Sequence, residues 1–138
     1  MNAFFDASAL IKRYVDEAGS DRVQEILSVC SSLALCVICL PEVLSGLCRL
    51  RRERRLSPQH YAEIKRALVR DAEDSTLIHI TDQVIVRTFD LLERWPLRSS
   101  DALHVACAAE WGADVFVSAD QRQCDAARAY GLRVETLR

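Results

Sequence analysis

The feature that most restricts the fold of this chain is the alternation of short apolar runs with segments of helical periodicity. At least three of the runs lack the apolar–polar alternation of a strand with one solvated face, which indicates a parallel sheet covered on both faces. Strands connected by helices in this way predict an α/β fold, a three-layer α/β/α sandwich around a mainly parallel five-stranded sheet. The runs with strand length and composition are NAFF (2–5), LALCVI (33–38), TLIHI (76–80), DVFVS (114–118) and LRVET (132–136).

Apolar residues at helical spacing fill the segments between these runs, in the order β-α-α-β-α-α-β-α-α-β-α-β. Ser57 followed by Pro58 predicts a helix start, and Gly131 predicts a helix end. Residues 99–111 (SSDALHVACAAEW) predict a helix that is buried on nearly all sides. The helix faces expected to be buried are Val23, Ile26, Leu27 and Cys30; Tyr61, Ile64 and Leu68; and Ile85, Phe89 and Leu92.

Length and composition predict one folded domain over residues 1–138, because half of the residues are hydrophobic. No signal-peptide pattern and no apolar stretch of membrane-spanning length is present, so we expect a soluble, cytoplasmic protein with no membrane partner. The six cysteines lie mostly in apolar runs, where free thiols behave as small hydrophobes. Cys36 and Cys39 form a lone CxxC motif whose spacing on a strand points them to opposite faces, which disfavours a zinc or redox site.

Four carboxylates fall where the predicted topology places one edge of the sheet. Asp6 ends the first strand, Glu42 opens the helix after the second strand, and Asp101 opens the helix that leads into the fourth. Asp120 lies just past the fourth strand. Strand carboxyl ends and helix amino ends meet at the same edge of a parallel sheet, where ligands bind. We therefore expect these four side chains to share a pocket.

Four unpaired carboxylates in one pocket repel one another, and a hard divalent cation relieves the repulsion. Mg²⁺ suits a sparse set of oxygen ligands because it keeps several waters. Such an ion can supply an attacking water and polarise a phosphoryl oxygen. The sequence contains no GxxxxGK phosphate loop and no obvious His or Cys nucleophile. Metal-assisted phosphodiester hydrolysis is the chemistry that fits.

Three of the residues near this edge also have a purely structural interpretation. Asp101 could cap the helix that it opens, although Ser99 and Ser100 already offer hydroxyls for capping. Ser8 and Ser118 stand two residues from Asp6 and Asp120, so each could hold a metal-bound water or orient its neighbouring carboxylate. Ordinary turn and cap chemistry is the alternative for both serines.

The formal net charge of −2 does not mark the chain as a nucleic-acid binder. Removing the four candidate carboxylates changes this charge to +2, so the remaining surface is slightly basic. Sixteen of the eighteen basic residues are Arg, and RLRRERR (49–55) holds five of them. Arginine donates bidentately to phosphate, but a solvated helix end whose cations complement the dipole explains the run equally well.

Four segments of the chain closely resemble a PIN-domain protein of the VapC toxin type, in register over nearly the whole length. No single motif is decisive, but four acids in order with matching flanks form a fairly specific signal. The segments are FFDASALIKRYVDEAGSDRV (4–23), PEVLSGLCRLRRERRLS (41–57), LRSSDALHVACAAEWGADVFVSAD (97–120) and DAARAYGL (125–132).

The resemblance implies a PIN-like fold and an endoribonuclease that depends on Mg²⁺ or Mn²⁺, with Asp6, Glu42, Asp101 and Asp120 as its acidic quartet. Ser118 stands where the family places Ser or Thr. The resemblance also implies RNA as substrate, a VapB-like antitoxin that occupies a hydrophobic groove and blocks the site, and a homodimer. The number of metal ions in the site, one or two, is left open, because QRQC (121–124) adds no acid that could complete a second metal site.

Basic residues and one histidine complete the candidate site. His104 lies one turn after Asp101 and is expected to be a packed histidine rather than a substrate contact. The residues expected to contact the RNA backbone are Arg13, Arg49, Arg52 and Arg98.

Two other functions compete with the nuclease. An aspartate-dependent phosphatase would use Asp6 as a nucleophile, but DASAL (6–10) lacks a second Asp two residues on, and only Lys12 and Lys65 are available as lysines. A non-catalytic scaffold of the same fold would not need all four acids. A phosphatase would release inorganic phosphate from a monoester, a nuclease would cut internal phosphodiesters, and a scaffold would do neither.

Overall fold

The sheet of this protein has five strands, all parallel, in the order β3-β2-β1-β4-β5. The computed structural model describes all residues from Met1 to Arg138. Each prediction of an element is confirmed in kind and order, although β2 and β3 end two residues earlier than the apolar runs suggest. The strands are β1 (Asn2–Phe5), β2 (Ser32–Cys36), β3 (Thr76–Ile78), β4 (Val115–Ser118) and β5 (Val134–Thr136).

The helices connect successive strands, and the helix start predicted at Ser57 and the helix end predicted at Gly131 are confirmed. Ser57 caps α4 by accepting a 3.0 Å hydrogen bond from the His60 amide, and Pro58 is its first residue. Gly131 follows α7 with a φ of +104°, a conformation that favours glycine. The helices are α1 (Ala7–Leu10), continued by a 3₁₀ turn (Ile11–Arg13), α2 (Ser20–Val29), α3 (Cys39–Arg52), α4 (Pro58–Asp74), α5 (Asp82–Arg94), α6 (Ser99–Trp111) and α7 (Gln121–Ala129).

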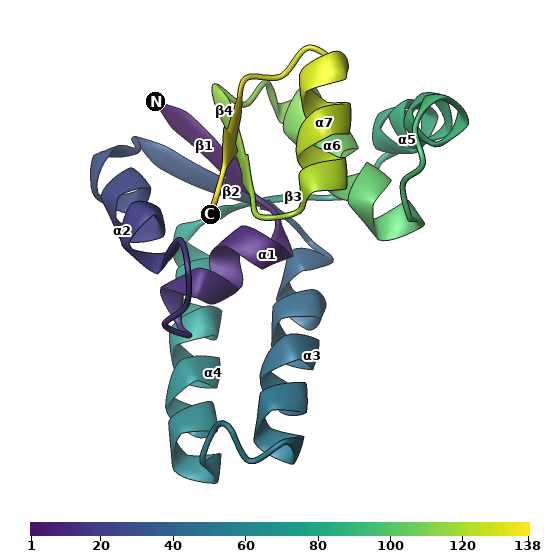
Figure 1. Cartoon of the computed structure of the whole chain (residues 1–138). Helices are drawn as coiled ribbons and strands as arrows, with labels where there is room; N and C mark the ends of the chain where they lie inside the picture. The colour runs from purple at the N-terminus through teal and green to yellow at the C-terminus, as the bar shows by residue number, and fades with distance from the viewer.

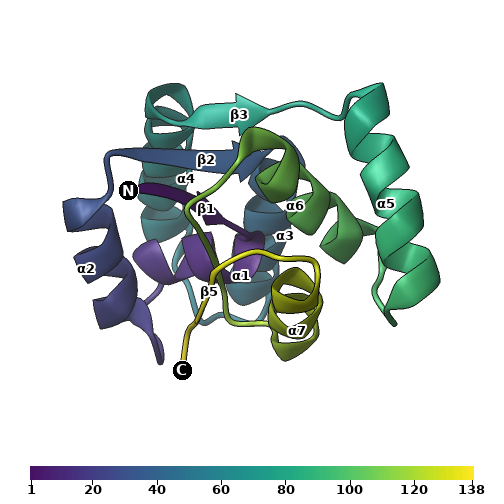
Figure 2. The same cartoon turned by 90° about the horizontal axis from the view of Figure 1, so that it is seen from above.

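Helices cover both faces of the sheet, as the absence of alternation in the strands predicts (Figures 1 and 2). Phe5 and Val117 point into one core with α1, α2, α3 and α4, whereas Phe4 and Phe116 point into the other with α5, α6 and α7. The two phenylalanine rings of the second core stack with their centroids 5.9 Å apart. The three-layer α/β/α sandwich is confirmed.

The cysteines follow the same division between the two cores. Cys36 ends β2 and packs in the core of α5, α6 and α7, while Cys39 begins α3 and packs in the other. All six cysteines are free thiols.

Helices α3 and α4 form an antiparallel hairpin that extends away from the sheet (Figure 1). Val43 and Leu47 of α3 and Ile64 and Leu68 of α4 are buried in the core at the base of this hairpin. The last turns of α3, the connecting loop and the first turns of α4 lie away from the rest of the molecule in the view of Figure 1. None of the helices combines the length and the apolar character that a membrane span requires.

The face of α5 that we expected to be buried is exposed. Ile85, Phe89 and Leu92 have exposed fractions of 38%, 62% and 39%, whereas Val84 and Leu91 are fully buried against α6. The prediction failed because α5 carries apolar residues on two sides, and periodicity does not say which side meets the sheet.

Candidate active site

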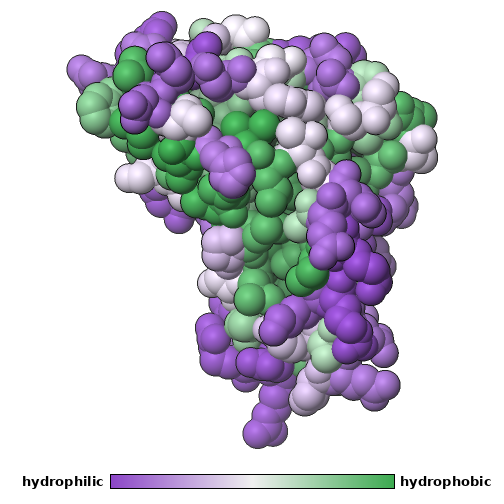
Figure 3. Space-filling model, turned by 180° about the vertical axis from the view of Figure 1, so that it is seen from behind, coloured by the Kyte–Doolittle hydropathy of each residue, from purple (hydrophilic) through white to green (hydrophobic).

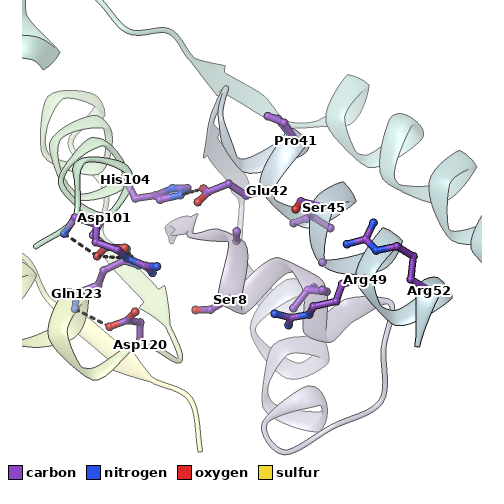
Figure 4. A pocket seen from close by; sticks show the side chains of 15 residues that line it. Ser8, Pro41, Glu42, Ser45, Arg49, Arg52, Asp101, His104, Asp120 and Gln123 are labelled. Atoms are coloured by element: carbon purple, nitrogen blue, oxygen red, sulfur yellow. Dashed lines mark hydrogen bonds and ion pairs between the residues drawn. The ribbon is translucent and has the colours of Figure 1, made fainter. Parts of the chain in front are cut away.

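A cleft of about 590 Å³ opens at the carboxyl edge of the sheet, between α6 and α7 on one side and α3 on the other. Glu42, Asp101 and Asp120 line it, as the topology predicts (Figure 4). Asp6 follows β1 directly, is fully buried and lies beneath the cleft rather than in its wall. The structure thus brings the four candidate acids to one place, three at the surface and one under it.

Two serines and a backbone amide hold the Asp6 carboxylate. Its Oδ1 accepts hydrogen bonds from the Ser8 hydroxyl at 2.7 Å and the Ala9 amide at 2.9 Å, while Oδ2 accepts one from the Ser118 hydroxyl at 2.5 Å. Burial raises the pKa of Asp6, although the charge of His104 and these hydrogen bonds lower it. The carboxylate is therefore oriented firmly but is costly to ionise.

The serines act differently from the geometry we expected. Ser8 lies in α1 rather than on an extended segment, yet it still binds its neighbour Asp6. Ser118 accepts a 3.0 Å hydrogen bond from the backbone amide of Asp120 and donates its own hydroxyl to Asp6. It therefore orients the carboxylate of Asp6 rather than that of its neighbour Asp120. Ser8 in turn accepts from the Ala119 amide at 2.9 Å. Both hydroxyls tie β1 to the turn after β4.

Asp101 both caps α6 and lines the cleft. Its Oδ2 accepts a 3.1 Å hydrogen bond from the backbone amide of Arg98, and neither Ser99 nor Ser100 caps the helix with its hydroxyl. Its Oδ1 accepts from the Gln123 side-chain amide at 3.1 Å. Asp101 is only 4% exposed, so these contacts fix its position at the cleft wall.

Gln123 was missed by the sequence analysis. Its backbone amide donates to Asp120 at 3.2 Å while its side chain donates to Asp101, so one residue of α7 sets both carboxylates. The Gln123 Oε1 is buried with no hydrogen-bond partner. Buried polar oxygens are rarely left unpaired, so this atom marks a place for a further polar group beside the acids. Nothing in QRQC (121–124) singles out this glutamine, because its role depends on the packing of α7 against α6.

His104 of α6 and Glu42 of α3 point toward each other and are joined by a hydrogen bond at the cleft (Figure 4). Nε2 of His104 lies 2.5 Å from Oε1 of Glu42, and the imidazole is 1% exposed. Burial by itself lowers the pKa of His104. The hydrogen bond to Glu42 and the negative charges of Asp6 and Glu42 together raise it by more, so the pKa lies above its ordinary value. The histidine is packed, as we expected, and it also fixes the Glu42 side chain.

Three of the four arginines predicted to contact RNA lie at the cleft. Arg49 and Arg52 line its far end along α3, and Arg98 lies beside Asp101 (Figure 4 shows the first two). Arg13 does not reach the cleft, because its guanidinium is paired with Asp71 of α4 at 2.8 and 3.2 Å. The prediction for Arg13 rested on its charge and its place in the sequence, and the structure shows that this charge is paired with Asp71.

The donor set suits a hard divalent cation. All four acids offer carboxylate oxygens, the ligands that Mg²⁺ and Mn²⁺ prefer, and the unpartnered Gln123 oxygen stands beside two of them. Oδ2 of Asp6 accepts only one hydrogen bond, so a lone pair remains for a cation. No three His, Cys, Asp or Glu side chains are already close enough together to form a metal cluster.

Comparison with known proteins decides the family. The PIN domain model matches residues 3–129. This chain belongs to the PIN domain family. Two relatives from Mycobacterium tuberculosis, Ribonuclease VapC45 and Ribonuclease VapC49, are each 30% identical over 137 residues, which cover 95% of this chain and 92% of the relative. The resemblance to VapC-type PIN domains is therefore confirmed.

Solved structures show the same fold at low sequence identity. The PIN domain superposes on Mycobacterium tuberculosis VapC20, a Sarcin-Ricin loop cleaving toxin, with a TM-score of 0.70 and 16% identity over 94% of this chain and 95% of that one. A DNA-bound VapBC from Salmonella typhimurium gives a TM-score of 0.71 at 17% identity, covering 99% and 98% of the two chains.

Proposed function

We propose that this PIN-domain protein is a divalent-metal-dependent endoribonuclease and the toxin of a toxin–antitoxin pair, acting in the cytoplasm. One observation carries the proposal. Glu42, Asp101 and Asp120 line a single cleft above the buried Asp6, in a chain whose relatives are VapC ribonucleases. This arrangement supports hydrolysis of internal RNA phosphodiesters.

The four carboxylates would hold Mg²⁺ or Mn²⁺. Such an ion, when bound, supplies a water of lowered pKa and neutralises charge on a phosphoryl oxygen. The chain's own residues do the positioning. Ser8 and Ser118 hold Asp6, His104 holds Glu42, and Gln123 holds Asp101 and Asp120.

Cations at both ends of the cleft would orient the RNA backbone. Arg98 stands beside Asp101, and Arg49 and Arg52 stand at the opposite end along α3. Arginine forks bind phosphate oxygens bidentately and carry no sequence information, so they position rather than select the substrate.

The test is cleavage of a labelled structured RNA by the purified protein with Mn²⁺, with excess chelator, and with Asp101→Asn. We expect discrete cuts with metal, and a loss of roughly a hundredfold or more in the variant and with chelator, about what loss of one group that stabilises the transition state costs. Cutting that survives Asp101→Asn would limit that residue to capping α6. A folded, metal-loaded protein that cuts no RNA would favour the non-catalytic scaffold.

The phosphatase alternative has no support from the geometry. Asp6, the nucleophile that a phosphatase would require, is fully buried and accepts hydrogen bonds from two hydroxyls. Release of inorganic phosphate from a monoester, with no cutting of RNA, would revive it.

An apolar groove is a candidate binding site for the antitoxin. It runs between α3 and α4 toward β3 on the face seen in Figure 3, has a volume of about 370 Å³, and Lys65 and Glu73 stand at its polar margins. Several solved relatives are VapBC complexes, including one from nontypeable Haemophilus influenzae. We propose that an apolar segment of the partner binds here. The apolar side chains of the groove are Leu40, Leu44, Leu68, Val69, Ala72 and Leu77.

A further inference from the structure

The charges of this protein are strongly segregated. Residues 49–70, which span the end of α3, the connecting loop and most of α4, contain eight Lys and Arg but only two Glu. We call this stretch the cationic arm. It carries a formal charge of +6, so the remainder of the chain carries −8 within the total of −2. The arm forms the outer part of the hairpin and continues along α4 toward the sheet, where Ile64 and Leu68 pack in the core (Figure 1).

The cations of the arm are almost all unpaired. Only Arg55 has an acidic partner, Glu53 at 3.6 Å. Outside the arm, seven of the ten Lys and Arg form ion pairs. Ordinary surface charges here are thus neutralised by neighbours, and those of the arm are left available for an external anion.

The arm has a second binding surface beside the cleft. A hollow of about 660 Å³ between the end of α3 and the outer side of α4 shares no residue with the cleft. Tyr61 forms part of it, and the Arg51 guanidinium lies 4.2 Å from the centre of that ring. This contact holds the guanidinium in place, so binding an anion orders it at little further cost. The cations that line the hollow are Arg51, Lys65, Arg66 and Arg70.

We propose that the cationic arm is an RNA exosite, which binds the phosphate backbone of the substrate outside the cleft. The proposal rests on the proposed ribonuclease function. Charge complementarity favours a polyanion, and the cations are continuous with the site, since Arg49 and Arg52 face the cleft while Arg51 of the same turn faces the hollow. An acidic protein segment is the competing occupant, and the test below separates the two.

The exosite sets a minimum length for tight binding. Arg52 lies ten residues along α3 from Glu42, which is about 15 Å at about 1.5 Å per residue. Arg66 and Arg70 lie on the neighbouring helix and line the hollow, which shares no residue with the cleft. An RNA of only a few nucleotides bound in the cleft therefore does not reach the hollow, whereas a stem–loop does.

The experiment compares two double variants that each remove two exposed, unpaired charges. Arg66→Gln/Arg70→Gln changes the exosite, and Arg133→Gln/Arg138→Gln is the matched control, which changes the two exposed arginines that flank β5 outside the hairpin. Binding of a labelled stem–loop RNA is measured by fluorescence anisotropy in chelator, where no cutting occurs. We expect the exosite variant to bind about tenfold more weakly and to lower the slope of log Kd against log salt by about 1.4–1.8, two phosphate contacts.

Several outcomes decide the proposal separately from the ribonuclease function. With Mn²⁺, the exosite variant should raise KM for the stem–loop and leave kcat unchanged, and a labelled tetranucleotide should bind both variants equally. Equal weakening by the two variants, or none, would overturn the exosite while wild-type cleavage still supported the nuclease. Polyglutamate that binds the arm as tightly as the RNA would assign the surface to an acidic protein. Absence of both RNA binding and cleavage in the wild type would instead remove the ribonuclease function itself.

Discussion

At the scale of the residue, Asp6 shows how a site can cost stability. The carboxylate is fully buried and its hydrogen bonds come from two hydroxyls and one amide, with no cationic side chain in direct contact. Because burial raises its pKa, ionisation of Asp6 is less favourable in the native protein than in the unfolded chain. At neutral pH the ionised group therefore lowers the free energy of unfolding, and a bound cation would offset that loss.

We expect Asp6→Asn to stabilise the metal-free protein at neutral pH, by on the order of 1 kcal/mol or about 4 °C in Tm. A raised native pKa means that the stability from the bound proton is complete below the ordinary value of 3.8 and is lost as pH rises through the native pKa. The advantage of the variant should therefore grow with rising pH and vanish in acid. Urea denaturation in chelator over this pH range measures it.

The control for this prediction is Asp16→Asn, which alters an exposed carboxylate of the loop before α2. It should change stability by less than about 0.5 kcal/mol at any pH. An Asp6→Asn protein that is less stable than the wild type at neutral pH would show that the serine hydrogen bonds outweigh the burial of charge.

The acids of the site were predictable from sequence because each stands at a fixed place relative to a strand end. The contacts among them were not. Gln123 joins α7 to α6, and His104 joins α6 to α3, so neither role follows from spacing along the chain. Arg13 was predicted to contact RNA from its residue type, but its guanidinium forms an ion pair with Asp71, which the sequence pattern did not indicate. The assignment of the four acids as metal ligands stays a prediction.

At the scale of the element, the kind and order of every helix and strand followed from apolar periodicity and caps. Helix orientation followed only where one face was apolar, as in α2, where Val23 and Ile26 are buried. In α5 two faces were apolar, and the contact with α6 selected the side of Val84 and Leu91. Packing against a neighbour, rather than local pattern, makes that choice.

One cluster anchors the hairpin to the body of the protein. Asp71 of α4 accepts from Arg13 at 2.8 and 3.2 Å and from the Tyr14 hydroxyl at 2.6 Å. Burial and this hydrogen bond raise the pKa of Tyr14, so the phenol remains a donor. The three bonds fix the base of α4 to the turn that follows α1.

We expect Asp71→Ala to lower the free energy of unfolding by about 1–3 kcal/mol, because it removes two charge-assisted hydrogen bonds and leaves a half-buried phenol unpaired. The matched control is Asp74→Ala, an exposed acid on the same helix with no ion pair, which should change stability by less than about 0.5 kcal/mol. Urea denaturation measures both. Equal effects of the two changes would mean that the cluster anchors nothing.

At the scale of the whole molecule, α5 presents an apolar stripe to solvent. Val86 and Phe89 are 63% and 62% exposed, and Ile85 and Leu92 lie beside them. Contiguous apolar surface of this kind marks interaction sites in soluble proteins. The homodimer, which the family resemblance implies, stays a prediction, and this stripe is the surface on which we place it.

We expect the wild type to be dimeric in light scattering and Phe89→Asp to be monomeric with an unchanged circular dichroism spectrum. A charge in a desolvated interface is costly, whereas an exposed side chain contributes little to the fold. Val29→Asp, at a 69% exposed position on α2, is the control and should remain dimeric. A Phe89→Asp dimer as tight as the wild type would place the interface elsewhere.

The separation of charge between hairpin and body also affects how this molecule meets another. A particle with +6 at one end and −8 over the rest is an electrical dipole, and it rotates in the field of an approaching polyanion. The body is repelled and the hairpin is drawn forward, so most encounters begin at the tip. From there the polyanion needs only to slide along α3 to reach the acids, whose own negative charge would otherwise keep it away.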